Sequence, residues 1–139
     1  MDSLDMAGHL IRRLHQLSTL VFVQRTQAAG YDLTPIQFAA LDAIHNHPGT
    51  DQATVAELIA YDRATIGGVI ERLEQKGWVD RVVSERDRRA RVLSLTAEGE
   101  RILQALVPVV RNLQNEILQA LGEADRARFL RLARQAVGS

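Results

Sequence analysis

The sequence predicts a mainly α-helical fold that carries one small β-hairpin. Six stretches place apolar residues at the three- and four-residue spacing of amphipathic helices. Residues 78–83 and 92–95 instead alternate loosely between apolar and polar, as strands do. The loop between these two segments is rich in arginine and contains Arg86, Asp87, Arg88, Arg89 and Arg91. A helix followed by a hairpin with a cationic tip is therefore the central unit of the chain, at residues 62–96.

The composition is that of one ordinary globular domain spanning residues 1–139. Apolar residues make up 46% and charged residues 24% of the chain, which argues against disorder. The 17 Lys and Arg balance the 17 Asp and Glu, so the formal net charge is zero. This balance argues against binding of nucleic acid through overall charge, but it allows a local basic site because salt screens surface fields beyond about 10 Å.

Several functional classes find no support in the sequence. The chain has no cysteine, which excludes disulfides, thiolate zinc sites and thiol redox switches. His45 and His47 are two residues apart on a predicted helix and point in different directions, so we expect no metal and no cofactor. We expect no enzyme, since no catalytic arrangement of Ser, His and Asp or of Cys and His is visible. The absence of a membrane span and of a signal peptide predicts a cytoplasmic protein.

An amphipathic helix is predicted over residues 4–29 and ends at Gly30. Its polar side carries His9, Arg12, Arg13 and Gln16, and His15 lies on the flank of this side. Two interpretations remain open: this side is simply solvated, or it forms the edge of a ligand pocket in which an arginine meets a carboxylate.

A second helix is predicted over residues 35–46. Thr34 is its N-cap, Pro35 occupies the first helical position, and Gln37 completes a capping box. The sequence HPG at residues 47–49 ends this helix.

Two short helices with a tight turn between them predict a helix-turn-helix. We expect the first over residues 52–61, capped by Thr50 or Asp51, and the second over residues 63–76, capped by Asp62. The second is the expected recognition helix, because its first turn offers polar groups away from the apolar stripe. The expected DNA contacts are Arg63, Ala64, Thr65, Gly67, Gly68 and Arg72, and the expected support from the first helix is Gln52 and Thr54.

Gly67 and Gly68 need an explanation, since each glycine costs about 1 kcal/mol relative to alanine in a helix interior. Close approach to a DNA backbone or to another helix would offset that cost, and the sequence leaves both open. The nearby charges also allow two interpretations. Arg72 and Lys76 can reach phosphates, whereas two neighbouring glutamates favour a solvated, ion-paired face.

The hairpin after Gly77 places its arginines beside the recognition helix. A helix of this size fits the major groove of DNA, and a slim arginine-rich hairpin tip suits the narrower minor groove. The sequence therefore predicts a winged helix-turn-helix over residues 32–96, in which the hairpin is the wing. We expect Asp87 to pair with one arginine and to hold the shape of the tip.

The helices on either side of this region are too apolar to stand alone. Thr96 caps a predicted long helix in which Pro108 predicts a kink, and a last helix follows Gly122. Residues 1–31 and 97–139 are therefore expected to form dimerisation helices that pack against a second chain around a two-fold axis. The dimerisation residues we expect are Leu10, Leu14, Leu106, Val110, Leu113, Ile117, Phe129 and Leu130.

Three segments of the chain carry a resemblance to a known family. They are residues 87–99, DRRARVLSLTAEG, residues 63–66, RATI, and residues 73–77, LEQKG. Through them the chain resembles the MarR family of bacterial transcriptional regulators, over nearly its whole length. The resemblance implies a triangular homodimer on double-stranded DNA, with recognition helices in successive major grooves and wing arginines in the minor groove.

The same resemblance implies roles for single residues of the DNA-binding region. Arg89 matches the wing arginine that the family places in the minor groove, and Asp87 matches the acid that orients it. The glycine pair of the recognition helix departs from the family, whose members more often carry polar or basic side chains there. Base recognition is therefore expected to depend more on Arg63 and Thr65.

Residues 9–16, HLIRRLHQ, resemble the opening helix of family members that regulate the catabolism of aromatic compounds. This implies an aromatic carboxylate or a phenolic as effector, bound between the dimerisation helices and the DNA-binding region. His9, Arg12, Arg13 and His15 are the ligand-binding candidates. The lack of cysteine excludes the thiol-based peroxide sensors of the family.

The expected function is that of a DNA-binding transcriptional regulator, and of a repressor as the commoner outcome in the family. An effector that favours a dimer with wrongly spaced recognition helices would lower DNA affinity by its preference for that state. Two alternatives remain: a winged-helix dimer that binds DNA constitutively, and a protein-interaction module without an effector.

Overall fold

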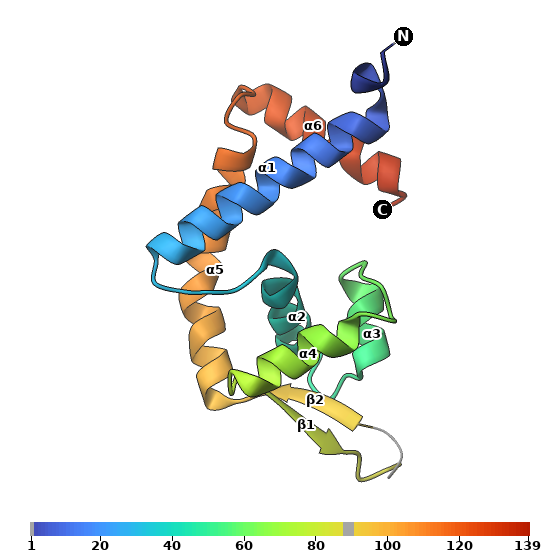
Figure 1. Cartoon of the computed structure of the whole chain (residues 1–139), viewed down its shortest axis with the longest axis vertical. Helices are drawn as coiled ribbons and strands as arrows, with labels where there is room; N and C mark the ends of the chain where they lie inside the picture. Colours follow the sequence, from blue (N-terminus) through green and yellow to red (C-terminus); the bar gives the residue numbers. More distant parts are fainter. Residues whose placement is uncertain (1, 88–90) are drawn as a thin grey trace.

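The computed structural model describes residues 2–87 and 91–139, which form helices around one short hairpin (Figure 1). In chain order the elements are the 3-10 helix Ser3–Asp5, α1 (Ala7–Ala28), α2 (Pro35–Asn46), α3 (Gln52–Leu58), α4 (Ile66–Gln75), β1 (Val79–Val83), β2 (Arg91–Leu95), α5 (Ala97–Ile117) and α6 (Glu123–Val137). The predicted mainly α fold with a small hairpin is confirmed. Within the described residues, no helix is both long enough and apolar enough to cross a membrane.

The molecule has two parts that α5 connects. The helices α2, α3 and α4 and the hairpin form the lower part in Figure 1, whereas α1 and α6 cross near the top. α5 starts just after β2 and runs upward to the second part. One continuous helix, with Pro108 inside it, therefore joins the winged helix-turn-helix to the flanking helices.

The hydrophobic core lies where α2, α4, β2 and the first half of α5 meet. Its largest fully buried side chains have less than 2% of their surface exposed. They include Leu41, Ile44, Ile66, Ile70, Leu73, Leu93, Leu103 and Leu106. Three of them come from α4, as its helical spacing predicted. Full burial of each such side chain contributes about 1.5–3 kcal/mol, so this core fixes α4 firmly relative to α5.

Two residues expected at a dimer interface belong instead to the core of the single chain. Leu106 and Leu113 are buried within the chain itself, because α1 packs along α5. Val110 and Ile117 are half-buried and pack against the same core. The dimerisation prediction is therefore wrong for Leu106 and Leu113, whose side chains a second chain cannot reach.

Three predicted helix starts are confirmed by their hydrogen bonds. Thr34 Oγ1 accepts from the Gln37 N–H, and Gln37 Oε1 accepts from the Thr34 N–H, both at 3.1 Å. Asp51 Oδ1 accepts from the Thr54 N–H at 2.7 Å. At the start of α5, Thr96 Oγ1 accepts from the Gly99 N–H at 3.0 Å. Each bond satisfies an N–H that has no partner within its helix.

The prediction that Asp62 caps the recognition helix is wrong, because α4 begins at Ile66. Asp62 Oδ1 accepts a hydrogen bond from the Ala64 N–H at 3.0 Å, and the Asp62 carbonyl accepts from the Thr65 N–H at 3.1 Å. Together with the bond from the Ile66 N–H to the Asp62 carbonyl at 3.0 Å, these bonds form a turn that leads into α4. Arg63, Ala64 and Thr65 therefore precede the helix that they were expected to start.

α3 is also shorter than predicted, since it ends at Leu58 and not near Tyr61. Ala60 has a φ of 55°, a left-handed conformation that a continuing right-handed helix does not contain. The Tyr61 N–H then donates to the Ala56 carbonyl at 2.8 Å and closes the turn between α3 and α4.

The hairpin is antiparallel, with Val83 opposite Arg91 at the end where the loop joins the two strands. Arg91 is therefore the first residue of β2, whereas the sequence had placed it in the loop. β2 also bonds to the segment before α3, where the Leu93 N–H donates to the Thr50 carbonyl at 2.8 Å. This contact fixes the hairpin against the helix-turn-helix.

Candidate nucleic-acid interface

α4 turns its apolar side to the core and leaves the opposite side uncovered. Three apolar residues of the helix are buried, and α4 packs on α2 and α3. Gly68 and Arg72 on the helix are exposed, as are Arg63, Ala64 and Thr65 in the turn before it. The predicted recognition residues are thus accessible, although half of them lie in a turn and not in the helix.

Arg63 and Arg72 are available for contacts with DNA. Neither side chain makes a hydrogen bond or an ion pair with another residue of the described ranges. The pKa of the Asp51 carboxyl lies below its usual value, first because the Thr54 N–H donates to it and, to a smaller extent, because Arg63 is near. One free cation therefore lies near the start of α3 and another on α4.

Gly67 and Gly68 have different surroundings. A Cβ at Gly67 would lie 3.2 Å from Nε2 of Gln52, a half-buried residue at the start of α3. A Cβ at Gly68 would meet nothing within 4 Å. Both glycines are in the first turn of α4, where fewer intrahelical bonds depend on them than in a helix interior. Close packing on α3 thus accounts for Gly67, whereas Gly68 leaves open space above the helix.

That open space is part of a groove of about 460 Å³ between the start of α2 and α4. Its walls include Thr34, Thr65 and Arg72. Hydroxyl groups and arginines are among the groups that contact phosphates in protein–DNA complexes. The groove is therefore suited to a DNA backbone.

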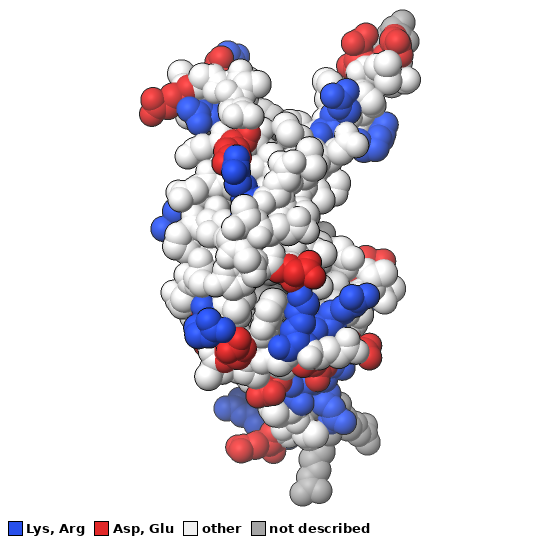
Figure 2. Space-filling view, turned by 60° about the vertical axis from the view of Figure 1, so that its left-hand side comes forward, with Lys and Arg blue, Asp and Glu red and all other residues white. Residues whose placement is uncertain are grey.

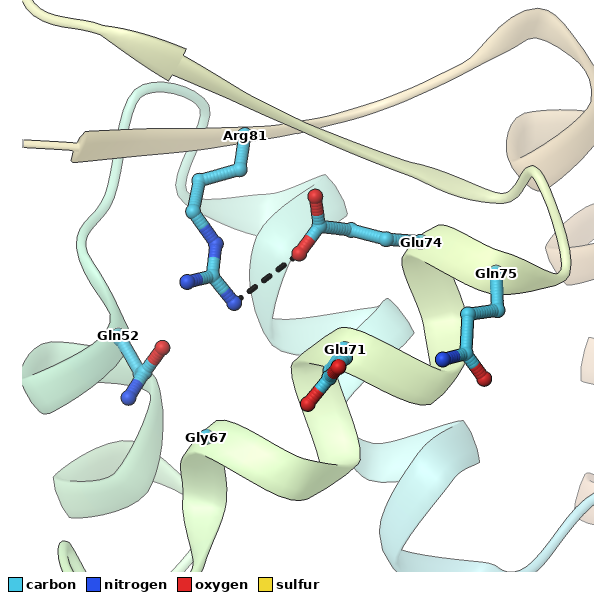
Figure 3. Close-up of a pocket in the computed structure, with 6 residues that line it drawn as sticks. All are labelled: Gln52, Gly67, Glu71, Glu74, Gln75 and Arg81. Atoms are coloured by element: carbon cyan, nitrogen blue, oxygen red, sulfur yellow. Dashed lines mark ion pairs between the residues drawn. The ribbon is translucent and has the colours of Figure 1, made fainter.

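A second cleft, of about 690 Å³, lies between α3, α4 and β1 (Figure 3). Arg81 reaches into it from β1 and forms an ion pair with Glu74 of α4, with 3.0 Å between Nη2 and Oε1. Nε of Arg81 is buried and has no hydrogen-bond partner among the described residues. Gln52, Gly67 and Glu71 line the cleft from α3 and α4. The ion pair between Arg81 and Glu74 connects the recognition helix to the wing.

The sequence-based predictions missed Arg81. It lies on the same strand face as Val79 and opposite Leu93, both of which are buried. An arginine at an inward position of a strand needs a partner, because burial of an unpaired charge is costly. The inward position of Arg81 on its strand, together with a glutamate on the preceding helix, is the sequence pattern from which the pair of Arg81 and Glu74 could have been predicted.

Lys76 is not available to a phosphate in this structure. Its ammonium group donates to the Asp32 carbonyl and lies 4.6 Å from the centre of the Trp78 ring. These contacts hold the end of α4 to the segment between α1 and α2. Of the two cations proposed for this helix face, Arg72 remains free.

The described part of the wing presents charged residues at its tip. Arg86 and Asp87 are exposed, and so is Arg91 at the start of β2. Arg88 and Arg89 lie outside the described residues. The pairing of Asp87 with an arginine and the role of Arg89 therefore stay predictions.

Charged side chains are unevenly distributed over the face drawn in Figure 2. Figure 2 shows Lys and Arg side chains grouped in the lower half of this face with Asp and Glu among them, and further charged side chains of both signs toward the upper end. Cationic side chains thus lie near one another on a chain whose formal net charge is zero.

The ligand candidates on α1 do not meet in one cavity of the single chain. His15 lines a largely apolar groove of about 530 Å³ between α1, α5 and α6, together with Arg126. Arg13 borders a different groove, which α1 alone forms. His9 is half-buried and Arg12 is exposed. Sequence reasoning missed Arg126 because it lies on another helix, far along the chain from His15.

An exposed helix and an arginine hairpin fixed to one core define a winged helix-turn-helix, a class that places the helix in the major groove. Comparison with known proteins agrees, since the model of the MarR family matches residues 31–90. The HTH-type transcriptional repressor NicR of Pseudomonas putida is 34% identical over 138 residues, which cover 99% of this chain and 86% of NicR. The chain belongs to the MarR family, as its sequence motifs had indicated.

Two solved structures of regulators share this fold along the whole chain. BpsR of Bordetella bronchiseptica, whose DNA binding is regulated by 6-hydroxynicotinic acid, has a TM-score of 0.90 at 27% identity and covers 100% of this chain and 98% of its own. The transcriptional regulator PcaV of Streptomyces coelicolor, in complex with its natural ligand, has a TM-score of 0.87 at 33% identity, with 100% and 96% covered. The relatives are thus transcriptional regulators of the MarR type.

Proposed function

We propose that the chain represses transcription as a homodimer that binds a palindromic operator and leaves it when an aromatic acid binds. The observation that carries this proposal is that Arg63 and Arg72 are exposed, with no ion-pair partner among the described residues, in a chain whose wing sequence is rich in arginine. Arginines in such a position contact phosphates and guanine edges. Residues 32–96 are the DNA-binding region of this proposal, and residues 1–31 and 97–139 are its dimerisation helices.

The apolar surfaces of α1 and α6 support the homodimer. α6 buries none of its residues within the single chain. Leu10 is 51% exposed and Leu130 is 44% exposed, while Leu14 and Phe129 are half-buried beside the α1–α5–α6 groove. Uncovered apolar side chains at helical spacing on two helices are best covered by the same helices of a second copy.

In this dimer, two copies of α4 enter successive major grooves about 34 Å apart. Arg63 and Thr65 contact base edges, and Arg72 contacts a phosphate. Arg89 enters the minor groove from the wing. Gly68 lets the backbone of the DNA approach α4 without a side chain in between.

The effector of this proposal is a hydroxylated aromatic or heteroaromatic carboxylic acid. The regulation of BpsR by 6-hydroxynicotinic acid supports this class. His9, Arg12, Arg13 and His15 are the proposed ligand residues, since a carboxylate needs a cation or an N–H donor. Binding shifts the dimer toward a spacing of the recognition helices that does not fit the operator.

Fluorescence anisotropy tests this proposal with the full chain and the DNA upstream of its own gene, at several salt concentrations. We expect tight, salt-dependent binding that 6-hydroxynicotinic acid or a benzoate-like acid weakens. Tight binding that no acid of the panel alters would retain the DNA-binding function and remove the effector. Binding no tighter than to random DNA would favour a protein-interaction module.

A further inference from the structure

We propose that Gln52 and Glu71 form a base-recognition notch over Gly67, which accepts the major-groove edge of a base with an exocyclic amino group. Adenine and cytosine are the two bases with such a group on that edge. The inference rests on the proposed DNA-binding function and adds an acidic residue to a recognition surface that sequence reasoning described through arginine, threonine and glycine.

Gly67 forms the floor of this notch, because it places no side chain between Gln52 and Glu71. Gln52 lies on α3, and its Nε2 is 3.2 Å from the position that a Cβ of Gly67 would take. Glu71 follows Gly67 by one helical turn and therefore lies on the same side of α4. Figure 3 shows Gly67 between Gln52 on one side and Glu71 on the other, at the edge of the cleft below the wing.

Glu71 is the acceptor of the notch. It is exposed and lines the cleft, and its side chain makes no hydrogen bond or ion pair with any residue in the described part of the chain. Glu74 differs, because Arg81 pairs with it. A free carboxylate beside a polyanion is repelled unless it accepts a hydrogen bond. In the major groove, the N4 amino group of cytosine and the N6 amino group of adenine are the donors.

Gln52 is the second polar group of the notch, and it can donate or accept. Glutamine is suited to adenine, to which it bonds at N6 and N7, and its amide can also donate to the N7 or O6 of a neighbouring guanine. The cap between Asp51 and Thr54 fixes the helix end that carries Gln52. Arg81 is held on Glu74 and forms no ion pair with Glu71.

The test is selection from a randomised duplex library, with the wild-type chain and the Glu71→Ala and Glu71→Gln variants treated in parallel. We expect wild type to select cytosine or adenine at one position of each half-site, by about tenfold over the other bases. Glu71→Ala should lose the base preference at this position and keep the base preferences at the other positions of the half-site. It also binds random duplex more tightly than wild type, because one negative charge is removed from the interface.

Glu123→Gln is the matched control, since it removes the same charge from the exposed start of α6. It leaves the selected motif and the affinity for random duplex unchanged. Identical motifs for wild type and Glu71→Ala would overturn the notch, even if affinity rose equally on all DNA, because Glu71 would then act only as a repulsive charge. A wild-type chain that selects no motif would contradict the proposed function instead.

The base that wild type selects identifies the edge. If wild type selects adenine, Gln52→Ala should weaken the preference at the same base pair, because Gln52 and Glu71 then contact one base. If wild type selects cytosine, Gln52→Ala should leave the base preference at this position unchanged and should alter the preference at the adjacent position. A Gln52→Ala variant with an unchanged motif in either case would remove Gln52 from the notch.

Discussion

Gly99 of α5 packs directly on the backbone of Trp78. A Cβ at Gly99 would overlap the Trp78 carbonyl oxygen and would lie 2.9 Å from the carbonyl carbon. The same carbonyl oxygen accepts a hydrogen bond from the Thr96 N–H at 3.0 Å, and Thr96 Oγ1 donates to the Gly77 carbonyl at 2.6 Å. The end of the recognition helix, the wing and the start of α5 therefore meet at one rigid junction.

Replacement of Gly99 by alanine should destabilise the fold strongly. Backbone atoms cannot move aside as a flexible side chain can, so we expect a loss of about 3 kcal/mol, at the upper end of overpacking costs. The thermal midpoint should fall by about 10 °C. Gly122→Ala is the control, because it has open space around it and an ordinary backbone conformation. Equal midpoints for both variants would contradict the close contact at Trp78.

Gly68→Ala should stabilise the fold and weaken DNA binding at the same time. Alanine is the better helix former, and nothing lies within 4 Å of the new Cβ, so we expect a gain of about 0.5 kcal/mol. The methyl group fills the space into which the DNA backbone is proposed to fit, so affinity for the operator should fall. Urea unfolding and fluorescence anisotropy measure the two effects. Unchanged affinity would mean that Gly68 does not face DNA.

The caps and apolar stripes were predictable because they depend on near neighbours in the chain. Thr34 and Gln37 are three residues apart and bond to each other, and Thr96 caps the helix that follows it. The start of α4 was not predictable in this way. Asp is a residue type that is common at N-caps, but the hydrogen bonds of Asp62 close a turn before α4. The choice between turn and helix depends on how α4 packs on α3.

The sequence predicted which side chains of the candidate site are exposed, but it did not predict the contacts between residues that are far apart in the chain. Arg63 and Arg72 are free and exposed, as their polar positions suggested. The pair of Arg81 and Glu74 brings a strand to a helix, so no local pattern contains it. The burial of Leu106 likewise follows from α1 packing on α5, which one apolar stripe cannot distinguish from a dimer interface.

Leu10→Gln should dissociate the proposed dimer. Leu10 is 51% exposed on α1 in the single chain, and its loss from an apolar interface removes about 1.5–3 kcal/mol per chain. Leu58→Gln on α3 is the matched control, because Leu58 is 47% exposed and lies in the DNA-binding region. Sedimentation velocity should give a lower dimer fraction for Leu10→Gln alone. A monomeric wild-type chain would refute the dimer itself.

Arg63→Ala and Arg89→Ala should weaken operator binding in different ways. Arg89→Ala removes a proposed backbone and minor-groove contact, so affinity should fall on all sequences and the salt slope should decrease by about 1. Arg63→Ala should also relax base preference. Arg111→Ala, at an exposed position of α5, is the charge control. Operator affinity equal to wild type in both test variants would remove these residues from the interface.

The cap at the start of α3 should make part of the stability depend on pH. The pKa of Asp51 is lowered below its usual value of 3.8, first by the Thr54 N–H and, in addition, by the charge of Arg63. A lowered pKa in the folded state means that the unfolded chain binds the proton more readily. The carboxylate therefore stabilises the fold fully above about pH 4, and this contribution is lost as the pH falls through the lowered value.

Asp51→Asn isolates this contribution, because asparagine also caps helices but carries no charge. Wild type should be more stable than Asp51→Asn at pH 7, and urea unfolding should show that difference narrowing as the pH falls below 4. Thr34→Ala removes a neutral cap from α2, at a cost of about 1 kcal/mol, and that cost should stay constant over the same range. A constant difference between wild type and Asp51→Asn would show that the hydrogen bond to Thr54 does not depend on the charge of the carboxylate.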